Sequence, residues 1–279
     1  MHAAVITLML MAQDNILLGC AVAVQSVKAF VYTSSATVVE GVAQHMASED
    51  TRVKTEKSKC DDYAKSKALA ETMVLQTNGT ANMLTVCLRL PSTYGERDEQ
   101  NIGEGIKAMR RNEHKLQVGD NTNLCEWLSA ENAAQAHLLA VEALLAEHQQ
   151  PKEIAERVAG EAFFVTDGEA LPFWDHFRLI WRAAGDRTAE SEVTKIPPLA
   201  IMSLAAIVET IYWIFTFGRT KPKAMRRDLL AFTFLERTFS IDKARKRLGY
   251  ILKANRNAQV QAGVRWYLDQ HFLGRDKGD

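Results

Sequence analysis

Residues 30–67 constrain the fold of this chain more than any other stretch. They begin with an apolar run, Phe-Val-Tyr, that leads into the hydroxyl residues 33–35, as a buried strand leads into a turn. A predicted helix follows, with Tyr63 and Lys67 four residues apart on one face. Each signal alone is common, but in this order they predict that a hydroxyl, a phenol and an ammonium meet at the carboxyl edge of a parallel sheet, where open α/β sheets bind ligands.

Composition sets bounds on what the chain can do. With 279 residues, 47% of them hydrophobic and 24% charged, it can form one large domain or two lobes. The 34 basic and 34 acidic residues cancel, so no basic excess indicates a nucleic-acid partner. No pair of the 4 cysteines has metal-ligand spacing and nothing marks a disulfide framework, which favours a reducing compartment and no metal site.

Apolar periodicity and capping residues predict alternating strands and helices, the pattern of an α/β fold. Strands are expected over residues 27–33, 83–90 and 161–167. Helices are expected over residues 14–26, 63–77, 101–111, 131–147, 173–184 and 260–272. Residues 41–59 are expected to form a loop, and a turn at residues 119–121 is expected to separate two short strands. A short helix in residues 239–250 is expected to stop at Gly249.

Two later segments match patterns of one enzyme family. Residues 89–95, Arg-Leu-Pro-Ser-Thr-Tyr-Gly, resemble an Arg-Pro-x-x-x-Tyr-Gly turn with Leu90 inserted. Residues 115–127 resemble a Gly-Asn/Asp-Asn-x-Asn-Leu-x-Asp-Trp segment, with Glu126 in place of the usual aspartate. The second pattern is the most specific of the motifs in this chain.

A third segment, residues 131–137, resembles Asp/Glu-Asn-Val-Ala-x-Ala-His, and we expect its His137 to pack rather than to catalyse. Together with residues 30–67, these segments resemble the short-chain dehydrogenase/reductase superfamily in its extended form. Within it, the resemblance is to the 3β-hydroxysteroid dehydrogenase family and its sterol-4α-carboxylate 3-dehydrogenase branch. It extends over residues 14–268, most of the chain.

The resemblance implies a fold and a division into domains. It implies a Rossmann-like, doubly wound parallel sheet as an incomplete NAD(P)-binding domain over residues 1–158. A smaller, mostly helical substrate lobe would follow over residues 159–279. It also implies a reaction, in which the 3β-hydroxyl of a steroid or sterol is oxidised with NAD or NADP. In a 4-carboxysterol the resulting ketone would then serve as the electron sink for loss of CO₂ from C4.

The resemblance also implies residue roles. Tyr63 would be the general base, and the Lys67 ammonium would stabilise the phenolate and hold the nicotinamide ribose. Ser35 would hold the substrate oxygen, with Ser34 as its fallback, because the sequence cannot choose between adjacent hydroxyls. The residues expected around the nicotinamide are Ser34, Tyr63, Lys67, Pro91 and Thr93.

One part of the family pattern has no counterpart in the sequence. The family opens with a strand, a Gly-x-x-Gly-x-x-Gly turn and a helix that hold the dinucleotide pyrophosphate. We therefore expect an N-terminally truncated sheet with an unpaired edge, either because the sequence is incomplete or because the cofactor half was lost. Such a chain is expected to bind NAD(P) weakly. It is also expected to be marginally stable or to need a partner, for which a homo-oligomer is one arrangement.

Residues 199–217 are almost entirely apolar, with Glu209 as the main exception. They are long enough to reach most of the way across a bilayer, but a central glutamate disfavours that. We expect a buried helix of the substrate lobe or a helix at a membrane surface. The basic residues that follow, up to residue 227, would suit anionic headgroups. Residues 199–227 would then place the protein on the cytoplasmic side of the endoplasmic reticulum membrane, or else the protein is cytoplasmic.

Two alternatives from other classes stay open at this point. One is a related reductase or epimerase that acts on a non-steroid, and the apolar residues 199–217 favour a lipophilic secondary metabolite over a nucleotide sugar. The other is a catalytically inactive homologue that binds a partner or a lipid surface. The absent glycine-rich turn favours inactivity, and the presence of Ser35, Tyr63 and Lys67 indicates a recent rather than an ancient loss.

Overall fold

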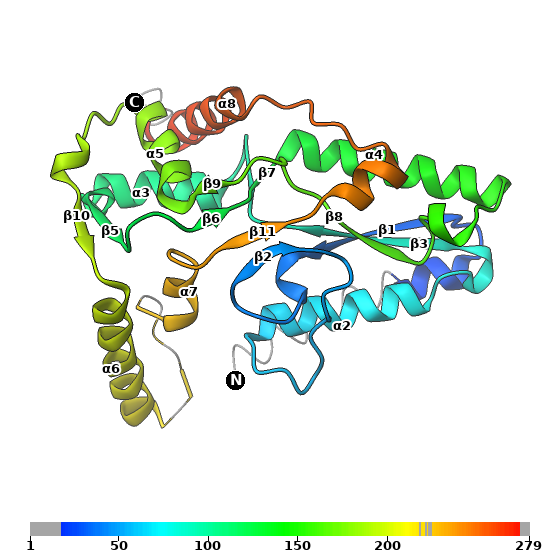
Figure 1. The fold of residues 1–279 in the computed structure, drawn as a ribbon, viewed down its shortest axis with the longest axis horizontal. Coiled ribbons are helices and arrows are strands. Elements are labelled where there is room, and N and C mark those ends of the chain that lie inside the picture. Colours follow the sequence, from blue (N-terminus) through cyan, green and yellow to red (C-terminus); the bar gives the residue numbers. More distant parts are fainter. Residues whose placement is uncertain (1–17, 218, 221, 223–224, 274–279) are drawn as a thin grey trace, which may run out of the picture.

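The computed structural model describes residues 18–217, 219–220, 222 and 225–273. Three parallel strands form its central sheet, in the order β1 (Ala29–Ser35), β3 (Leu84–Leu90) and β8 (Glu161–Phe164). Helix α2 (Asp62–Gln76) covers one face of the sheet and helix α4 (Ala130–Gln149) covers the other (Figure 1). This arrangement confirms the predicted α/β, Rossmann-like class. Among the described residues, β1 pairs on one side only, with β3.

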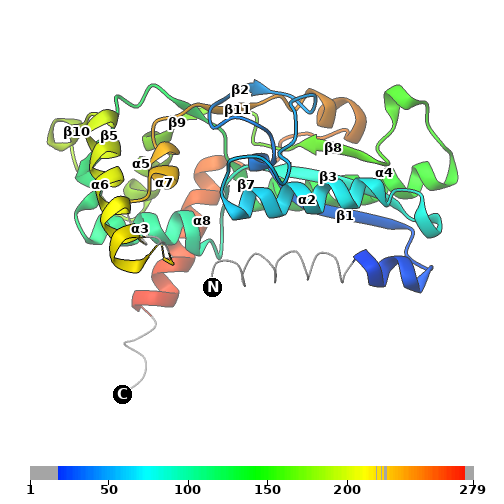
Figure 2. The same cartoon turned by 90° about the horizontal axis from the view of Figure 1, so that it is seen from below.

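The register of the sheet brings two turns together. Strands β1 and β3 pair from Ala29 opposite Leu84 to Ser35 opposite Leu90, so they end at the same edge. Helix α2 begins beside that edge because the Asp61 carboxylate accepts a hydrogen bond of 2.9 Å from the amide of Ala64, which caps the helix. The hydroxyl residues at the end of β1, the turn after β3 and the first turn of α2 therefore lie together near the middle of the molecule's long axis (Figure 2).

A second core lies among three shorter helices. They are α3 (Glu104–Arg110, preceded by a π-helical turn at Glu99–Gly103), α5 (Phe173–Ala183) and α8 (Arg256–Leu268, followed by a π-helical turn at Asp269–Leu273). Buried aromatic and aliphatic residues from both sides of residue 158 form this core, among them Tyr94, Trp127, Ile180 and Tyr267. Strand β8 lies after residue 158 but pairs with β3 in the central sheet. The central sheet and the second core therefore each contain residues from both sides of the expected boundary at residue 158.

Helix α8 packs with its backbone directly on the turn that follows β4 (Thr93–Tyr94). A Cβ atom added at Gly263 would lie 2.4 Å from the carbonyl oxygen of Gly95 and 2.3 Å from Cδ1 of Ile102. Only glycine allows so close an approach. Strand β4 pairs with β7 (Leu128–Ser129), so this contact supports the turn that borders the sheet edge.

The remaining strands correct two expectations. Residues 41–59 contain a strand, β2 (Gln44–Ala47), and the expectation of a loop throughout was wrong there. Its sheet has the order β2, β11 (Arg237–Phe239), β6 (Leu124–Cys125) and β9 (Leu171–Pro172). The two short strands around residues 119–121 exist but do not pair with each other. One is β6, and the other is β5 (Leu116–Val118), which pairs with β10 (Thr194–Ile196).

Several predicted ends agree closely with the structure. The short helix before Gly249 is present, with a π-helical turn at Ala244–Leu248, and Gly249 ends it at a φ of +66°. Residues 18–24 are helical, and residues 14–17 of the first expected helix lie outside the described residues.

Helix α6 (Pro198–Thr216) projects from the body and is followed by α7 (Arg227–Ala231) (Figure 1). Ala205 is its one buried residue, so the expectation of a buried lobe helix was wrong. Among the described residues it is the one helix long and apolar enough to cross a membrane, on length and composition alone. Glu209 forms an ion pair of 2.7 Å with Arg227, which links α6 to α7.

His176 lies inside the second core without a polar partner. Its ring stacks on Trp127 with centroids 3.8 Å apart, and neither ring nitrogen has a hydrogen-bond partner in the described part of the chain. Burial lowers the pKa of His176 from 6.5 to about 3. The histidine is therefore neutral in the folded protein over a pH range in which it becomes charged in the unfolded chain.

We expect this histidine to make the fold sensitive to acid. Between pH 6.5 and about 3, the unfolded chain binds one proton more than the folded chain at this histidine. The contribution of neutral His176 to the free energy of unfolding is therefore complete above pH 6.5 and is lost as the pH falls through this window. The slope is at most about 1.4 kcal/mol per pH unit. Urea unfolding at pH 7.5, 5.5 and 4.5 should show a flatter pH dependence in His176→Phe. The exposed-site variant His45→Gln is the control. An unchanged slope in His176→Phe contradicts the prediction.

Candidate active site

A cleft of about 980 Å³ opens at the carboxyl edge of β1 and β3, and we call it the reaction cleft. Five of the six residues expected in the site line it: Ser34, Ser35, Tyr63, Pro91 and Thr93. The sixth, Lys67, lies one helical turn beyond Tyr63. The structure therefore brings the expected hydroxyls, the phenol and the turn after β3 to one place.

Lys67 is anchored to the strand that carries the hydroxyls. Its Nζ donates a hydrogen bond of 3.1 Å to the carbonyl oxygen of Thr33 and lies 4.8 Å from the centroid of the Tyr32 ring. The ammonium is thus held beside the end of β1, on the helix face that also presents Tyr63.

Two phenols line the reaction cleft, and their surroundings differ. Tyr63 is 50% exposed, and its hydroxyl makes no hydrogen bond with the residues that the structure describes. Tyr94 is buried and donates a hydrogen bond of 2.7 Å to Asp167. Burial and the Asp167 carboxylate raise the pKa of Tyr94 well above its usual range. Of the two, Tyr63 is the phenol whose proton is accessible to a bound substrate.

The two adjacent serines are also distinguishable. Ser34 donates a hydrogen bond of 2.6 Å to the buried carboxylate of Glu71. Ser35 accepts a bond of 3.2 Å from the amide of Thr37, and its Oγ lies 2.9 Å from the Thr37 hydroxyl, where either oxygen can donate. Since Ser34 is held by a buried charge, Ser35 is the hydroxyl that can turn toward a ligand.

Glu71 belongs to a buried network that the sequence reasoning missed. Its carboxylate accepts from Nη2 of Arg89 at 2.7 Å and from Nε at 3.1 and 3.2 Å, and the two side chains are 1% and 3% exposed. The network joins α2, β1 and β3 beneath the reaction cleft. A signal was available, because Tyr63, Lys67 and Glu71 follow one another at intervals of four residues on one face of α2.

Residues 115–127, the segment with the most specific family motif, join neighbouring strands and helices through buried hydrogen bonds. Glu126 is buried, and its carboxylate accepts a hydrogen bond of 2.7 Å from the amide of Phe239 and one of 3.1 Å from the Thr166 hydroxyl. Burial raises the pKa of Glu126. Asn121 accepts a hydrogen bond of 2.8 Å from the amide of Trp174 at the start of α5. These contacts connect β6 to β11 and to α5. The motif residues Glu126 and Asn121 therefore have structural contacts in this fold.

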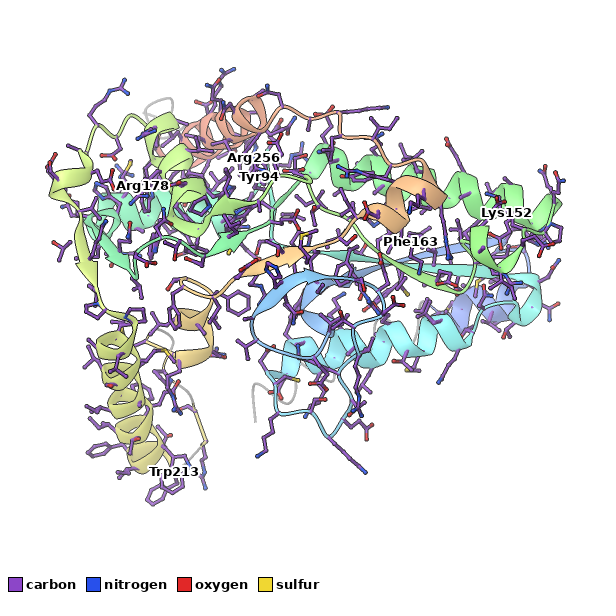
Figure 3. The ribbon with its side chains drawn as sticks, in the orientation of Figure 1. Tyr94, Lys152, Phe163, Arg178, Trp213 and Arg256 are labelled. Atoms are coloured by element: carbon purple, nitrogen blue, oxygen red, sulfur yellow. The ribbon has the colours of Figure 1, made fainter. Side chains whose placement is uncertain are left out.

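The third family segment likewise positions other elements. The Asn132 amide donates a hydrogen bond of 2.8 Å to Asp167, the acceptor of the Tyr94 hydroxyl. Figure 3 shows Tyr94 in the interior, close to Arg256 from α8. Nε2 of His137 lies 2.7 Å from the Thr33 hydroxyl, and its Nδ1 lies 2.7 Å from the carbonyl of Ala133. His137 thus bridges α4 and β1, in agreement with the expected packing role.

A second cleft, of about 1190 Å³, adjoins the first, and we call it the α6 cleft. The two clefts share residues 36–37, Asp61, Arg226, Phe232 and Arg237 among others. Apolar side chains from α6 and from the segment before β11 line much of it, including Met202, Trp213, Phe232, Phe234 and Leu235. Together the clefts offer a polar end beside Ser35 and Tyr63 and an apolar end beside α6.

Comparison with known sequences identifies relatives over most of the chain. Sterol-4-alpha-carboxylate 3-dehydrogenase, decarboxylating, from Gibberella zeae is 34% identical over 86% of this chain and 78% of its own length. The enzyme of the same name from Schizosaccharomyces pombe is 33% identical over 86% of this chain and 65% of its own length. The chain therefore spans about two thirds to three quarters of these relatives.

Comparison with solved structures agrees on the fold. The dTDP-glucose 4,6-dehydratase from Streptomyces venezuelae, whose structure contains NAD and TYD, superposes with a TM-score of 0.65 over 97% of this chain and 69% of that one, at 19% identity. The sequence profile of the 3-beta hydroxysteroid dehydrogenase/isomerase family matches residues 9–197. The chain belongs to the 3-beta hydroxysteroid dehydrogenase/isomerase family.

Proposed function

We propose that this chain oxidises the 3β-hydroxyl of a steroid or sterol, and that a 4-carboxysterol then loses CO₂ from C4. The observation that carries the proposal is the reaction cleft, which gathers Ser35, Tyr63 and the turn after β3, with Lys67 anchored beside them. The names of the two relatives support the substrate class. The apolar α6 cleft supports a ligand with a large hydrocarbon body.

Each residue has a defined task in this proposal. Ser35 donates a hydrogen bond to the substrate oxygen, and Tyr63 accepts the hydroxyl proton at its phenolic oxygen. Before this transfer, the Lys67 ammonium stabilises the phenolate form of Tyr63, which becomes neutral when it takes the proton. NAD or NADP, when bound, supplies the hydride acceptor, and Pro91, Thr93 and the ammonium of Lys67 would hold its nicotinamide end. Lys67 suits this role because its ammonium has three N–H groups. One donates to the Thr33 carbonyl oxygen, and two can donate to the cofactor.

The direct test is turnover of a 3β-hydroxy-4α-carboxysterol. We expect NADH or NADPH to form, followed by release of CO₂, and the matching 3α-hydroxy epimer to be inert. Absence of both products, in a protein that binds NAD or NADP, would remove the proposal and favour an inactive homologue. Turnover of a smaller lipophilic alcohol instead would favour the reductase alternative.

We also propose that α6 lies on a membrane surface, on the cytoplasmic side of the endoplasmic reticulum. The alternative is a cytoplasmic protein without membrane contact. The exposed apolar side chains of α6 support the membrane contact, with Trp213 66%, Phe215 80% and Phe217 86% exposed. Figure 3 shows Trp213 near the free end of α6. In the basic cluster that follows, Arg219 is exposed. Arg226 and Arg227 are paired with Asp228 and Glu209, and Lys221 and Lys223 lie outside the described residues.

Flotation with anionic liposomes tests this contact. We expect the protein to float, and the double variant Phe215→Ser/Phe217→Ser to lose at least about tenfold in membrane affinity, because each phenylalanine contributes about 1.5–3 kcal/mol on burial. The control is Ile154→Ser, which removes an equally exposed apolar side chain (73%) outside α6. A wild-type protein that stays in solution at low salt contradicts the prediction, as does an unaffected double variant.

A further inference from the structure

Arg237 lies at the junction of the two clefts and has no counter-ion among the residues that the structure describes. It lies on β11, between β2 and β6, and lines both the reaction cleft and the α6 cleft. Its guanidinium carbon lies 4.3 Å from the centroid of the Phe232 ring. Within the described part of the chain, the guanidinium forms no ion pair and no hydrogen bond with a side chain or a carbonyl.

The other cations that line the clefts are accounted for. Arg226 pairs with Asp228, and Arg227 pairs with Glu209. Lys54 donates two hydrogen bonds of 2.5 Å to main-chain carbonyls. Lys59 and Arg97 are exposed, so water can solvate them.

Arg237 differs from all of these, because it is half-buried and held in place without an acceptor. The carboxylate that acts on its charge is Asp61, with an effect smaller than that of the Cys125 thiol, and one oxygen of Asp61 already caps α2. Burial lowers the pKa of Arg237, as expected for a cation withdrawn from water. Leaving a buried charge unpaired is costly, so such a site favours an incoming anion.

We propose that Arg237 binds the carboxylate of the sterol substrate. The inference rests on the proposed function and deepens it. In a 4-carboxysterol the carboxylate is on the carbon next to C3, so it must lie in the same cleft as Ser35 and Tyr63, which Arg237 also lines. The planar guanidinium can donate two parallel hydrogen bonds to a carboxylate. The guanidinium carbon lies over the Phe232 ring, a contact that involves none of its N–H donors.

This contact would make Arg237 a specificity residue. It would select sterols that still carry the 4-carboxylate over those that have lost it, and so favour release of the decarboxylated product. It would also fix which face of the sterol ring points toward Tyr63. The steroid body would extend into the apolar α6 cleft.

Binding to the full chain without a cofactor tests the inference. The ligands are a 3β-hydroxy-4α-carboxysterol and its methyl ester, which has the same shape without the charge, and calorimetry measures both affinities. We expect the wild-type protein to prefer the acid by about 10- to 100-fold. Arg237→Met and Arg237→Gln should each abolish this preference by weakening the acid alone. Arg237→Lys should keep part of it. Arg110→Met, whose wild-type guanidinium lies over the Phe272 ring outside both clefts, should keep all of it.

The possible outcomes separate the inference from the proposed function. A wild-type protein that binds acid and ester equally overturns the role of Arg237 and leaves the sterol function standing. A protein that binds neither overturns both. Two neutral variants are used because one of them may fold poorly, and circular dichroism melting selects the folded one. If the folded neutral variant keeps the acid preference but loses affinity for NAD, the guanidinium serves a phosphate instead, and the inference is wrong.

Discussion

Tyr63→Phe is expected to lower turnover of a 3β-hydroxysterol by about 10²- to 10⁴-fold, the usual contribution of a positioned general base. The phenol makes no hydrogen bond with the described residues and is 50% exposed, so its removal should leave the fold unchanged. Binding of the sterol should also be nearly unchanged, because Ser35 and the apolar cleft remain. The measurement is kcat and KM for the sterol with NAD or NADP as the hydride acceptor.

The comparison that isolates this effect is Tyr212→Phe, which removes an exposed phenol from α6. It should retain wild-type turnover. If Tyr63→Phe turned over sterol at the wild-type rate, Tyr63 would lose its role. The buried Tyr94 would be a poor replacement, because its proton is engaged by Asp167.

The parts of the fold that local chemistry determines could be predicted from the sequence. The helix expected over residues 63–77 is observed at Asp62–Gln76, because Asp61 caps its start. The strand expected over residues 83–90 is observed at Leu84–Leu90. Apolar runs, caps and glycine stops act within a few residues, and the sequence shows them directly.

Other features depend on partners far along the chain. Strand β2 exists because Gln44 pairs with Arg237 of β11, and nothing near residues 41–59 shows that partner. The different contacts of Ser34 and Ser35 likewise depend on Glu71 and Arg89, which come from α2 and β3. The exposure of α6 depends on what packs against it, and its apolar sequence is equally suited to a core. In each case the deciding contact lies outside the local pattern.

The site itself was predictable in outline because its residues follow consecutive strand ends. Ser35 is the last residue of β1 and Pro91 follows β3, and parallel strands in register end at one edge. The unpaired Arg237 could not be foreseen in the same way. Asp228 and Glu209 pair with Arg226 and Arg227, and among the described residues neither pairs with Arg237. The three-dimensional arrangement shows these pairings and the sequence does not.

Glu71→Ala is expected to destabilise the folded protein by about 3–5 kcal/mol, because it leaves the Arg89 guanidinium buried without its counter-ion. The Ser34 hydroxyl would lose its acceptor at the same time. The free energy of unfolding from urea titration is the measurement. Lys107 and Glu104 form an exposed ion pair, so Glu104→Ala serves as the control and should cost less than about 1 kcal/mol.

The double variant Glu71→Leu/Arg89→Met separates two contributions to the free energy of unfolding. One is the net contribution of the intact ion pair, and the other is the loss caused by leaving one charge unpaired. Removing both charges exchanges a desolvated ion pair for apolar packing, which is often neutral or stabilising. We therefore expect the double variant to recover most of the stability that Glu71→Ala loses. It should nevertheless lose the discrimination between the two serines, because Ser34 is no longer held by Glu71 and is free to turn toward the ligand. A loss of less than 1 kcal/mol in Glu71→Ala would show that the network does not hold α2 against the sheet.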